Sequence, residues 1–405
     1  MGRPWAMVHE LAIGILINAV VLGFARFSYG IILPFMQQGL GITYTQAGLL
    51  GTVTALGYVG MVMMAGMVAT KWGNKVAFSF GTLIASISLL ALGLSKRFSV
   101  VMLWMLLAGV GTSFTYTPLV SYFMERYSHI RATVTGIVSG GWGVGILFVG
   151  FAVPWLAAAN PENGWRLAWM AFGVIGLLTF GLSLSLPASK SQQPASPPSQ
   201  KHTEEKKESL LSVIYLNPSV NCHGIIYFCI GLSYLIPPTF LLAYMMHAGI
   251  SSKLAGFWMA LNGFFGIFSG PLWGLLADRF GRREMFRLSM FCNVVALILP
   301  TIWENGVAFL FSCLLLGVTG GGMISLLLAN VSQHVPTPYI SAALGYVTFY
   351  FGIGQLLGPF VTGWIIDTWS NGFRFAFWFA VLVLSVGYFM TVIVPSSGVK
   401  TMGST

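Results

Sequence analysis

Long apolar runs, separated by short polar connections, recur along the whole of this sequence. A helix needs about 20 apolar residues to cross the hydrocarbon core of a bilayer. Twelve runs approach this length, so we predict an all-α membrane protein with twelve transmembrane helices. The predicted spans are residues 11–35, 46–68, 76–94, 100–123, 133–156, 167–186, 222–246, 254–276, 286–302, 307–331, 340–366 and 373–394.

Composition places the chain in a lipid membrane rather than in water. Hydrophobic residues make up 56% of the 405 positions and charged residues only 7%, whereas a soluble domain carries about 25% charged residues. The formal net charge of +10 does not indicate a nucleic-acid partner, because the basic residues lie in short loops between apolar runs. The four cysteines lie in apolar segments without the spacing of metal ligands. We therefore expect no metal site and no cofactor.

The two halves of the chain repeat each other. Matching positions are Gly66 with Gly274, Gly109 with Gly317 and Arg166 with Arg374, each 208 residues apart, and Gly143 with Gly352, 209 apart. This offset predicts two pseudo-symmetric six-helix bundles, residues 1–187 and 211–405, with the parallel repeat of a rocker-type transporter. The stretch between them, residues 188–210, is rich in Pro, Ser, Lys and Glu, so we expect a flexible cytoplasmic linker.

The distribution of Lys and Arg predicts the orientation in the membrane. With the N-terminus placed in the cytoplasm, fourteen of the twenty basic residues fall on the cytoplasmic side and five on the outer side. Cytoplasmic loops carry the excess of Lys and Arg in membrane proteins. We therefore expect a multi-pass protein of the bacterial inner membrane, with both termini in the cytoplasm.

The remaining basic residue, Arg26, lies inside the first predicted span. Residues 11–35 are otherwise almost wholly apolar and include no acidic residue. A charge at a helix centre costs roughly 2.5–3.5 kcal/mol on insertion scales, and such residues are usually functional. A permanently protonated guanidinium without a nearby carboxylate is a ready partner for an anion. The alternative is a structural role, in which Arg26 binds backbone carbonyl groups.

The acidic residues narrow the chemistry further. All ten Asp and Glu residues lie at span ends, in loops or in the linker. Exporters of cationic drugs and sugar–proton symporters usually hold a carboxylate inside the membrane as a proton site, and the predicted spans offer none. A lone Arg beside Tyr and Thr hydroxyls suits a small carboxylate, held by the guanidinium fork.

A ten-residue motif, GLLADRFGRR, lies between the eighth and ninth predicted spans. It resembles the signature G-x-x-x-D-R-x-G-R-R of the major facilitator superfamily, and the resemblance covers nearly the whole chain. The resemblance implies that superfamily's two-bundle fold. It also implies a latch of the cytoplasmic gate formed by Asp278, Arg279 and Arg283. The first-half copy, residues 66–75, has Thr70 in place of the acid.

Within the superfamily, the stretch GFARFSYG around Arg26 is similar to the first helix of the YbfB-like branch, and the general plan resembles monocarboxylate porters. In the superfamily the first, fourth, seventh and tenth helices line the path, with contributions from the fifth, eighth and eleventh. Polar and aromatic side chains on these helices are candidate substrate-binding residues, although each aromatic could equally serve in packing. They are Arg26, Tyr29, Thr112, Tyr116, Trp142, Tyr227, Tyr234, Asn262, Tyr346 and Tyr350.

These features predict a secondary active transporter that moves a small organic anion, a monocarboxylate, by rocker-switch alternating access. A proton carried with the anion, or a second anion in exchange, would be its other partner. We expect a monomer surrounded by lipid. Two alternatives are an exporter of neutral or amphipathic small molecules and a membrane receptor that does not transport. We do not expect an enzyme, because the sequence has no nucleophile–base pair, metal cluster or phosphate-binding loop.

Overall fold

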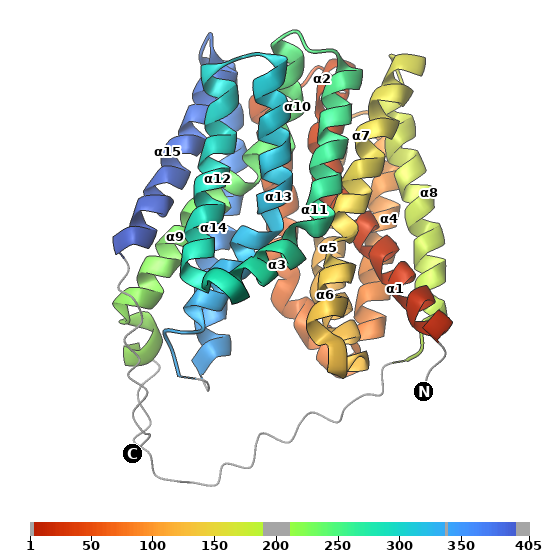
Figure 1. The fold of residues 1–405 in the computed structure, drawn as a ribbon. Coiled ribbons are helices and arrows are strands. Elements are labelled where there is room, and N and C mark those ends of the chain that lie inside the picture. Colours follow the sequence, from red (N-terminus) through yellow and green to blue (C-terminus); the bar gives the residue numbers. More distant parts are fainter. Residues whose placement is uncertain (1–3, 189–210, 337–338, 394–405) are drawn as a thin grey trace, which may run out of the picture.

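The computed structural model describes residues 4–188, 211–336 and 339–393, which form helices joined by short turns (Figure 1). Within these ranges, twelve helical spans are long and apolar enough to cross a membrane, which confirms the predicted all-α membrane fold. The start of α1 (Pro4–Asn18) and the end of α15 (Gly372–Ile393) lie at the same end of the bundle, the lower end in Figure 1. We call this the terminal end and the opposite one the distal end.

The helices between these two follow in chain order. They are η1 (Ala19–Phe27), α2 (Ser28–Leu40), α3 (Tyr44–Trp72), α4 (Asn74–Leu94), α5 (Phe98–Arg126), η2 (Ser128–Ile130), α6 (Arg131–Ser139), α7 (Gly141–Ala159), α8 (Gly164–Ser185), η3 (Leu211–Tyr215), α9 (Pro218–Tyr234), α10 (Ile236–His247), α11 (Ser252–Phe280), α12 (Arg282–Ile302), α13 (Gly306–Val331) and α14 (Ile340–Thr368). We call α1–α8 the first half and α9–α15 the second half. The predicted linker, residues 188–210, lies outside the described residues except for Ala188.

Three of the predicted spans consist of more than one helix. The first contains a π-helical stretch, η1, at whose end the Ser28 N–H bonds the Gly23 carbonyl five residues back. The fifth is divided into α6 and α7 at Gly140. The seventh is divided into α9 and α10, with Pro237 in the first turn of α10. Proline lacks an N–H and is accommodated best in the first turn of a helix, which is where Pro237 lies in α10.

The sequence repeat is matched in the backbone. Among the described residues, φ is positive only at four glycines, which form two pairs 208 residues apart. Gly73 and Gly281 have φ of 90° and 93°, and Gly41 and Gly249 have φ of 64° and 84°. Glycine adopts this region without the clash that a Cβ would cause. The same sharp turns therefore join corresponding helices in both halves, including the α11–α12 connection that carries the GLLADRFGRR motif.

The two halves meet along two long seams, where α3 packs on α14 and α7 packs on α11, and at a third, shorter contact between α2 and α10. Small residues let the backbones approach closely. A Cβ at Gly48 of α3 would lie 2.2 Å from the Pro359 carbonyl oxygen of α14. In the other seam, a Cβ at Gly256 of α11 would lie 2.4 Å from the Gly150 carbonyl oxygen of α7. Both contacts lie in the part of the bundle toward the distal end, which they close.

A carboxylate joins the halves at the distal end of the α3–α14 seam. Asp367, in the last turn of α14, accepts hydrogen bonds from the backbone N–H groups of Tyr44 (3.0 Å) and Thr45 (2.6 Å) at the start of α3. It also accepts one from the Thr45 hydroxyl, at 2.6 Å. The first turn of a helix has unpaired N–H groups and a partial positive charge. Asp367 therefore caps a helix of the opposite half.

We expect Asp367→Ala to loosen the distal closure, because it removes all three hydrogen bonds between the halves at this point. Electron–electron distances between spin labels at Gln38 and His247, exposed at the distal ends of α2 and α10, should shift toward longer values. Glu304→Ala is the matched control, since Glu304 accepts its bond from Tyr244 within the second half (2.8 Å). Equal distance distributions in the parent and Asp367→Ala would contradict this role.

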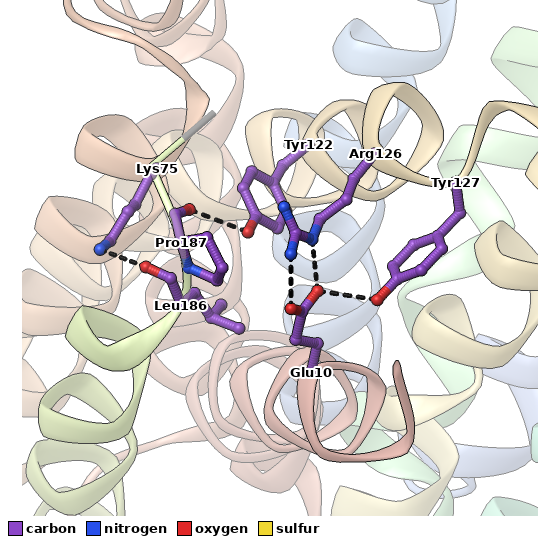
Figure 2. A network of polar contacts seen from close by, with 7 residues as sticks. All are labelled: Glu10, Lys75, Tyr122, Arg126, Tyr127, Leu186 and Pro187. Carbon is purple, nitrogen blue, oxygen red and sulfur yellow. Dashed lines mark hydrogen bonds and ion pairs between the residues drawn. The ribbon is translucent and has the colours of Figure 1, made fainter. Parts of the chain in front are cut away.

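A buried carboxylate organises the terminal end of the first half (Figure 2). Glu10 of α1 is only 6% exposed. It accepts two hydrogen bonds from the Arg126 guanidinium, the one from Nη2 at 2.6 Å, and one from the Tyr127 hydroxyl at 2.7 Å. Burial, and then the hydrogen bond to Glu10, raise the pKa of Tyr127 to about 12, so at neutral pH this tyrosine stays a protonated donor.

The same region fixes the end of α8. The Lys75 ammonium donates hydrogen bonds to the backbone carbonyls of Leu184 (2.8 Å) and Leu186, and the Tyr122 hydroxyl donates to the carbonyl of Pro187 (3.0 Å). The last carbonyls of a helix have no partner within it. Side chains from α4 and α5 thus satisfy the carbonyls that follow α8, as Figure 2 shows.

We expect Glu10→Ala to lower the stability of the protein by roughly 1.5–3 kcal/mol, the range for hydrogen bonds to charged groups. The loss leaves Arg126 without its carboxylate partner. Glu284→Ala removes the pair with Arg287, in which the Glu284 side chain is 59% exposed, and should change stability by less than about 1 kcal/mol. Thermal unfolding of the purified variants in detergent measures both, and equal midpoints would contradict the expectation.

Candidate functional site

A cavity of about 1070 Å³ lies between the two halves. Its walls come from η1, α3, α5, α6 and α7 of the first half and from α9 to α15 of the second, among the described residues. Asp278, in the last turn of α11, and Thr133 of α6 line it, so it extends to the terminal end. At the distal end it stops at the close contacts between the halves.

Arg26 lines this cavity from the end of the π-helical stretch η1. The stretch packs closely on α7, because a Cβ at Gly23 would lie 2.6 Å from the Gly145 Cα. π-Helical turns are uncommon and frequently occur at functional sites. The tight packing fixes the backbone from which the Arg26 side chain enters the cavity.

The partners of Arg26 among the described residues are neutral. Its Nη2 donates a 2.8 Å hydrogen bond to the Gln355 side-chain oxygen on α14, in the opposite half. Its Cζ lies 4.4 Å from the centre of the Tyr58 ring of α3. An amide oxygen and a ring face contribute partial negative charge only. The site therefore keeps a full positive charge, with N–H donors left to bind an anion.

Aromatic side chains form much of the wall around Arg26. Phe27 lies between Trp142 of α7 (5.9 Å between ring centres) and Tyr234 of α9 (6.1 Å). Phe351 of α14 lies 5.7 Å from Tyr234 and 4.4 Å from Tyr227, stacked on the latter. All five residues line the cavity. The structure thus brings rings from both halves together next to one cation.

Six of the ten predicted binding residues line the cavity: Arg26, Tyr116, Trp142, Tyr227, Tyr234 and Asn262. Asn262 does so while its amide donates to the Cys313 carbonyl (2.9 Å). Substrate binding by these residues stays a prediction.

The other four predicted residues lie outside the cavity lining and bind protein groups. The Tyr29 hydroxyl donates to the Ala47 carbonyl (2.8 Å) and the Thr112 hydroxyl to the Val21 carbonyl (3.0 Å). The hydroxyls of Tyr346 and Tyr350 bond each other at 2.9 Å. In a regular α-helix of 3.6 residues per turn Tyr29 would lie on the same face as Arg26, but π-helical η1 turns more widely just before it.

The three predicted gate residues lie near the α11–α12 turn. Asp278 lines the cavity, the Arg279 Cζ lies 5.4 Å from the Phe280 ring centre, and half-buried Arg283 is the second residue of α12. Their role as a latch stays a prediction.

Two residues that contact Arg26, Gln355 and Tyr58, are not among the binding residues predicted from the sequence. Gln355 is 1% exposed and is a polar residue inside an apolar run, the same signal that singled out Arg26 and Asn262. Tyr58 lies on the second span, a helix not expected to line the path. No pattern in the sequence distinguishes it from a packing tyrosine.

Comparison with known proteins identifies the family. Residues 18–392 match the family model described as "Uncharacterised MFS-type transporter YbfB". The chain belongs to this family of major facilitator superfamily (MFS) transporters. This confirms the resemblance to the YbfB-like branch, and the family and its fold are those of transporters.

Relatives and solved structures agree with this assignment. The chain is 24% identical to monocarboxylate transporter 6 of Mus musculus, over 96% of this chain and 87% of the mouse protein. It is 26% identical to agnestins efflux protein AgnL12 of Paecilomyces divaricatus, over 75% of this chain and 67% of the fungal protein. The fold is similar to a D-xylose–proton symporter (TM-score 0.79, 14% identity, 98% of this chain, 100% of that one). It is also similar to a bacterial homologue of the human lysosomal transporter Spinster, crystallised inward-facing and unoccupied (TM-score 0.77, 16% identity, 97% and 98%).

Proposed function

We propose that this MFS transporter moves a small organic anion, a monocarboxylate, across the membrane by alternating access. The observation that carries the proposal is Arg26, a cation in a cavity between the halves whose partners there are neutral. A carboxylate matches the guanidinium fork in geometry and charge. The relationship to a protein named monocarboxylate transporter 6 supports this substrate class.

In the proposed cycle, binding of the anion removes the obstacle to closing the cavity. A bare guanidinium sealed into a dry cavity is costly to desolvate, whereas a paired one costs less. With Arg26 paired, the terminal end closes, the two distal seams part and the site opens to the other side. Asp278, Arg279 and Arg283 latch the terminal end in its closed state. A proton carried with the anion, or a second anion in exchange, completes the transport stoichiometry.

We place the terminal end in the cytoplasm of a bacterium, a placement that the charge bias of the loops supports, and we propose that the protein is a monomer in the inner membrane. On that assignment the structure is the inward-open state. The cavity reaches the terminal end, and the Asp367 cap closes the distal end. The similar Spinster homologue was crystallised inward-facing, which agrees with this state.

A second candidate function is export of neutral or amphipathic compounds. The aromatic wall and the relationship to a protein named as an efflux protein favour it. The two functions differ in their dependence on the charge of Arg26, which a neutral substrate does not need.

We expect Arg26→Ala to abolish uptake of radiolabelled monocarboxylates into proteoliposomes. Arg26→Lys keeps the charge but loses the bidentate fork, so its uptake should fall between those of the parent and the Ala variant. Arg97→Ala, at an exposed position between α4 and α5, is the control and should transport as the parent does. Anion uptake by Arg26→Ala at the parental rate would refute the proposal.

We expect Gln355→Glu to block anion binding, because it places a carboxylate where the Gln355 oxygen lies 2.8 Å from Arg26. The introduced carboxylate would pair with the Arg26 guanidinium and compete with the substrate anion for it. Thr348→Glu adds the same charge to the same cavity two turns away, about 10 Å along α14, and should weaken binding much less. Isothermal titration of both variants with a carboxylate that the parent binds tests this. Equal effects of the two substitutions would contradict it.

A further inference from the structure

The aromatic side chains around Arg26 form a continuous series of rings. It runs from Trp142 through Phe27, Tyr234 and Phe351 to Tyr227, with successive ring centres 5.9, 6.1, 5.7 and 4.4 Å apart. We call these five side chains the ring series. Centre-to-centre distances of 4.5–7 Å are those of favourable aromatic pairs. Because all five line the cavity, an aromatic ring that enters it can form ring–ring contacts of the same kind with them.

The ring series begins next to the cation. Phe27 follows Arg26 directly in η1. The Tyr58 ring covers one face of the guanidinium at 4.4 Å, and the Gln355 side-chain oxygen accepts a hydrogen bond from its Nη2. A carboxylate must therefore approach the remaining N–H donors from the cavity. The body of the same molecule then lies among the rings.

The charges of the wall allow one carboxylate only. Among the described residues that line the cavity, Arg26 and Asp278 are the charged ones. Asp278 lies near the terminal end of the cavity. It is sixteen residues beyond Asn262, another lining residue of α11, which is about 24 Å along the helix at 1.5 Å per residue. A second carboxylate finds no second cation, and near the terminal end it meets an acidic side chain.

The size of the cavity also excludes a good fit for the smallest acids. Pockets of about 300–1000 Å³ suit drug-sized ligands, and this one measures about 1070 Å³. An acid of two or three carbons bound to Arg26 leaves the partly exposed rings of the series, those of Trp142, Tyr234 and Phe351, facing water. An aromatic acid displaces that water from ring faces, which are apolar.

We propose that the substrate is an aromatic monocarboxylate, with its carboxylate on Arg26 and its ring among the ring series. This inference rests on the proposed function and narrows its substrate class. The single cation selects one carboxylate, and the rings select a flat apolar body.

The test is isothermal titration of the purified protein with benzoate, cyclohexanecarboxylate, acetate, phthalate and benzamide. We expect benzoate to bind most tightly, cyclohexanecarboxylate less tightly, and acetate and phthalate at least tenfold more weakly than benzoate. Benzamide, which has the ring without the charge, should bind weakly. Arg26→Ala should abolish benzoate binding.

A ring variant separates the two parts of the site. Phe351→Leu removes a ring of the series while keeping an apolar side chain, and should weaken benzoate roughly 2- to 10-fold, the worth of an aromatic contact. It should weaken cyclohexanecarboxylate and acetate less than it weakens benzoate. Phe311→Leu, at a 53% exposed position on α13, is the matched control and should bind all probes as the parent does.

The possible results distinguish the proposed aromatic substrate class from the proposed anion transport on which it rests. Acetate or phthalate binding as tightly as benzoate, with both dependent on Arg26, overturns the aromatic class and leaves anion transport standing. Equal loss of benzoate and acetate in Phe351→Leu also overturns it. Benzamide binding as tightly as benzoate, with neither affected by Arg26→Ala, overturns the proposed function and this inference together.

Discussion

The guanidinium of Arg26 is the constraint around which the cavity is arranged. A permanent charge inside an apolar bundle needs compensation, and a buried carboxylate would supply it in full. Here an amide oxygen from α14 and a ring face from α3 supply only part. The charge is held in place without being neutralised. It is also held jointly, since η1 and α3 belong to one half and α14 to the other. A ligand that binds Arg26 therefore also affects the contact between the halves, because Arg26 is hydrogen-bonded to Gln355 of the other half.

The structure separates this charged centre from the parts that hold the bundle together. Two hydrogen-bonded carboxylates lie toward the ends, Glu10 with Arg126 and Tyr127 at the terminal end and Asp367 on the start of α3 at the distal end. Around Arg26 the described wall consists of rings, glycines and neutral polar groups such as Gln355 and Asn262. Acidic residues are thus used for anchoring, whereas the centre of the cavity stays electropositive. A path for an anion requires this placement of the carboxylates, because a carboxylate at its centre would repel the transported anion.

The fold could be predicted from the sequence almost completely, and the site only in part. Twelve apolar runs predict the twelve spans, and the 208-residue repeat in the sequence is matched by the positive φ angles of Gly73 and Gly281. Tyr29 follows Arg26 by three residues, a spacing that puts two side chains on one face of a regular α-helix, but it lies beyond the π-helical stretch and outside the cavity lining. The sequence identifies Asp367 only as an acidic residue at the end of a span. Its role as a cap of α3 has no sequence signal, because the residues that it binds lie 322 and 323 positions away. Contacts between distant helices have no local signal.

Glycines set the closest approach of the two halves. Where α3 meets α14 and α7 meets α11, Gly48 and Gly256 lie directly against backbone carbonyls of the facing helix, whereas at Gly266 of α11 the facing group is the Trp142 ring of α7. A side chain at Gly48 or Gly256 has no room, because its Cβ would lie 2.2 or 2.4 Å from a carbonyl oxygen. The spacing of the helices at these two points therefore depends on the absence of a single methyl group from each glycine.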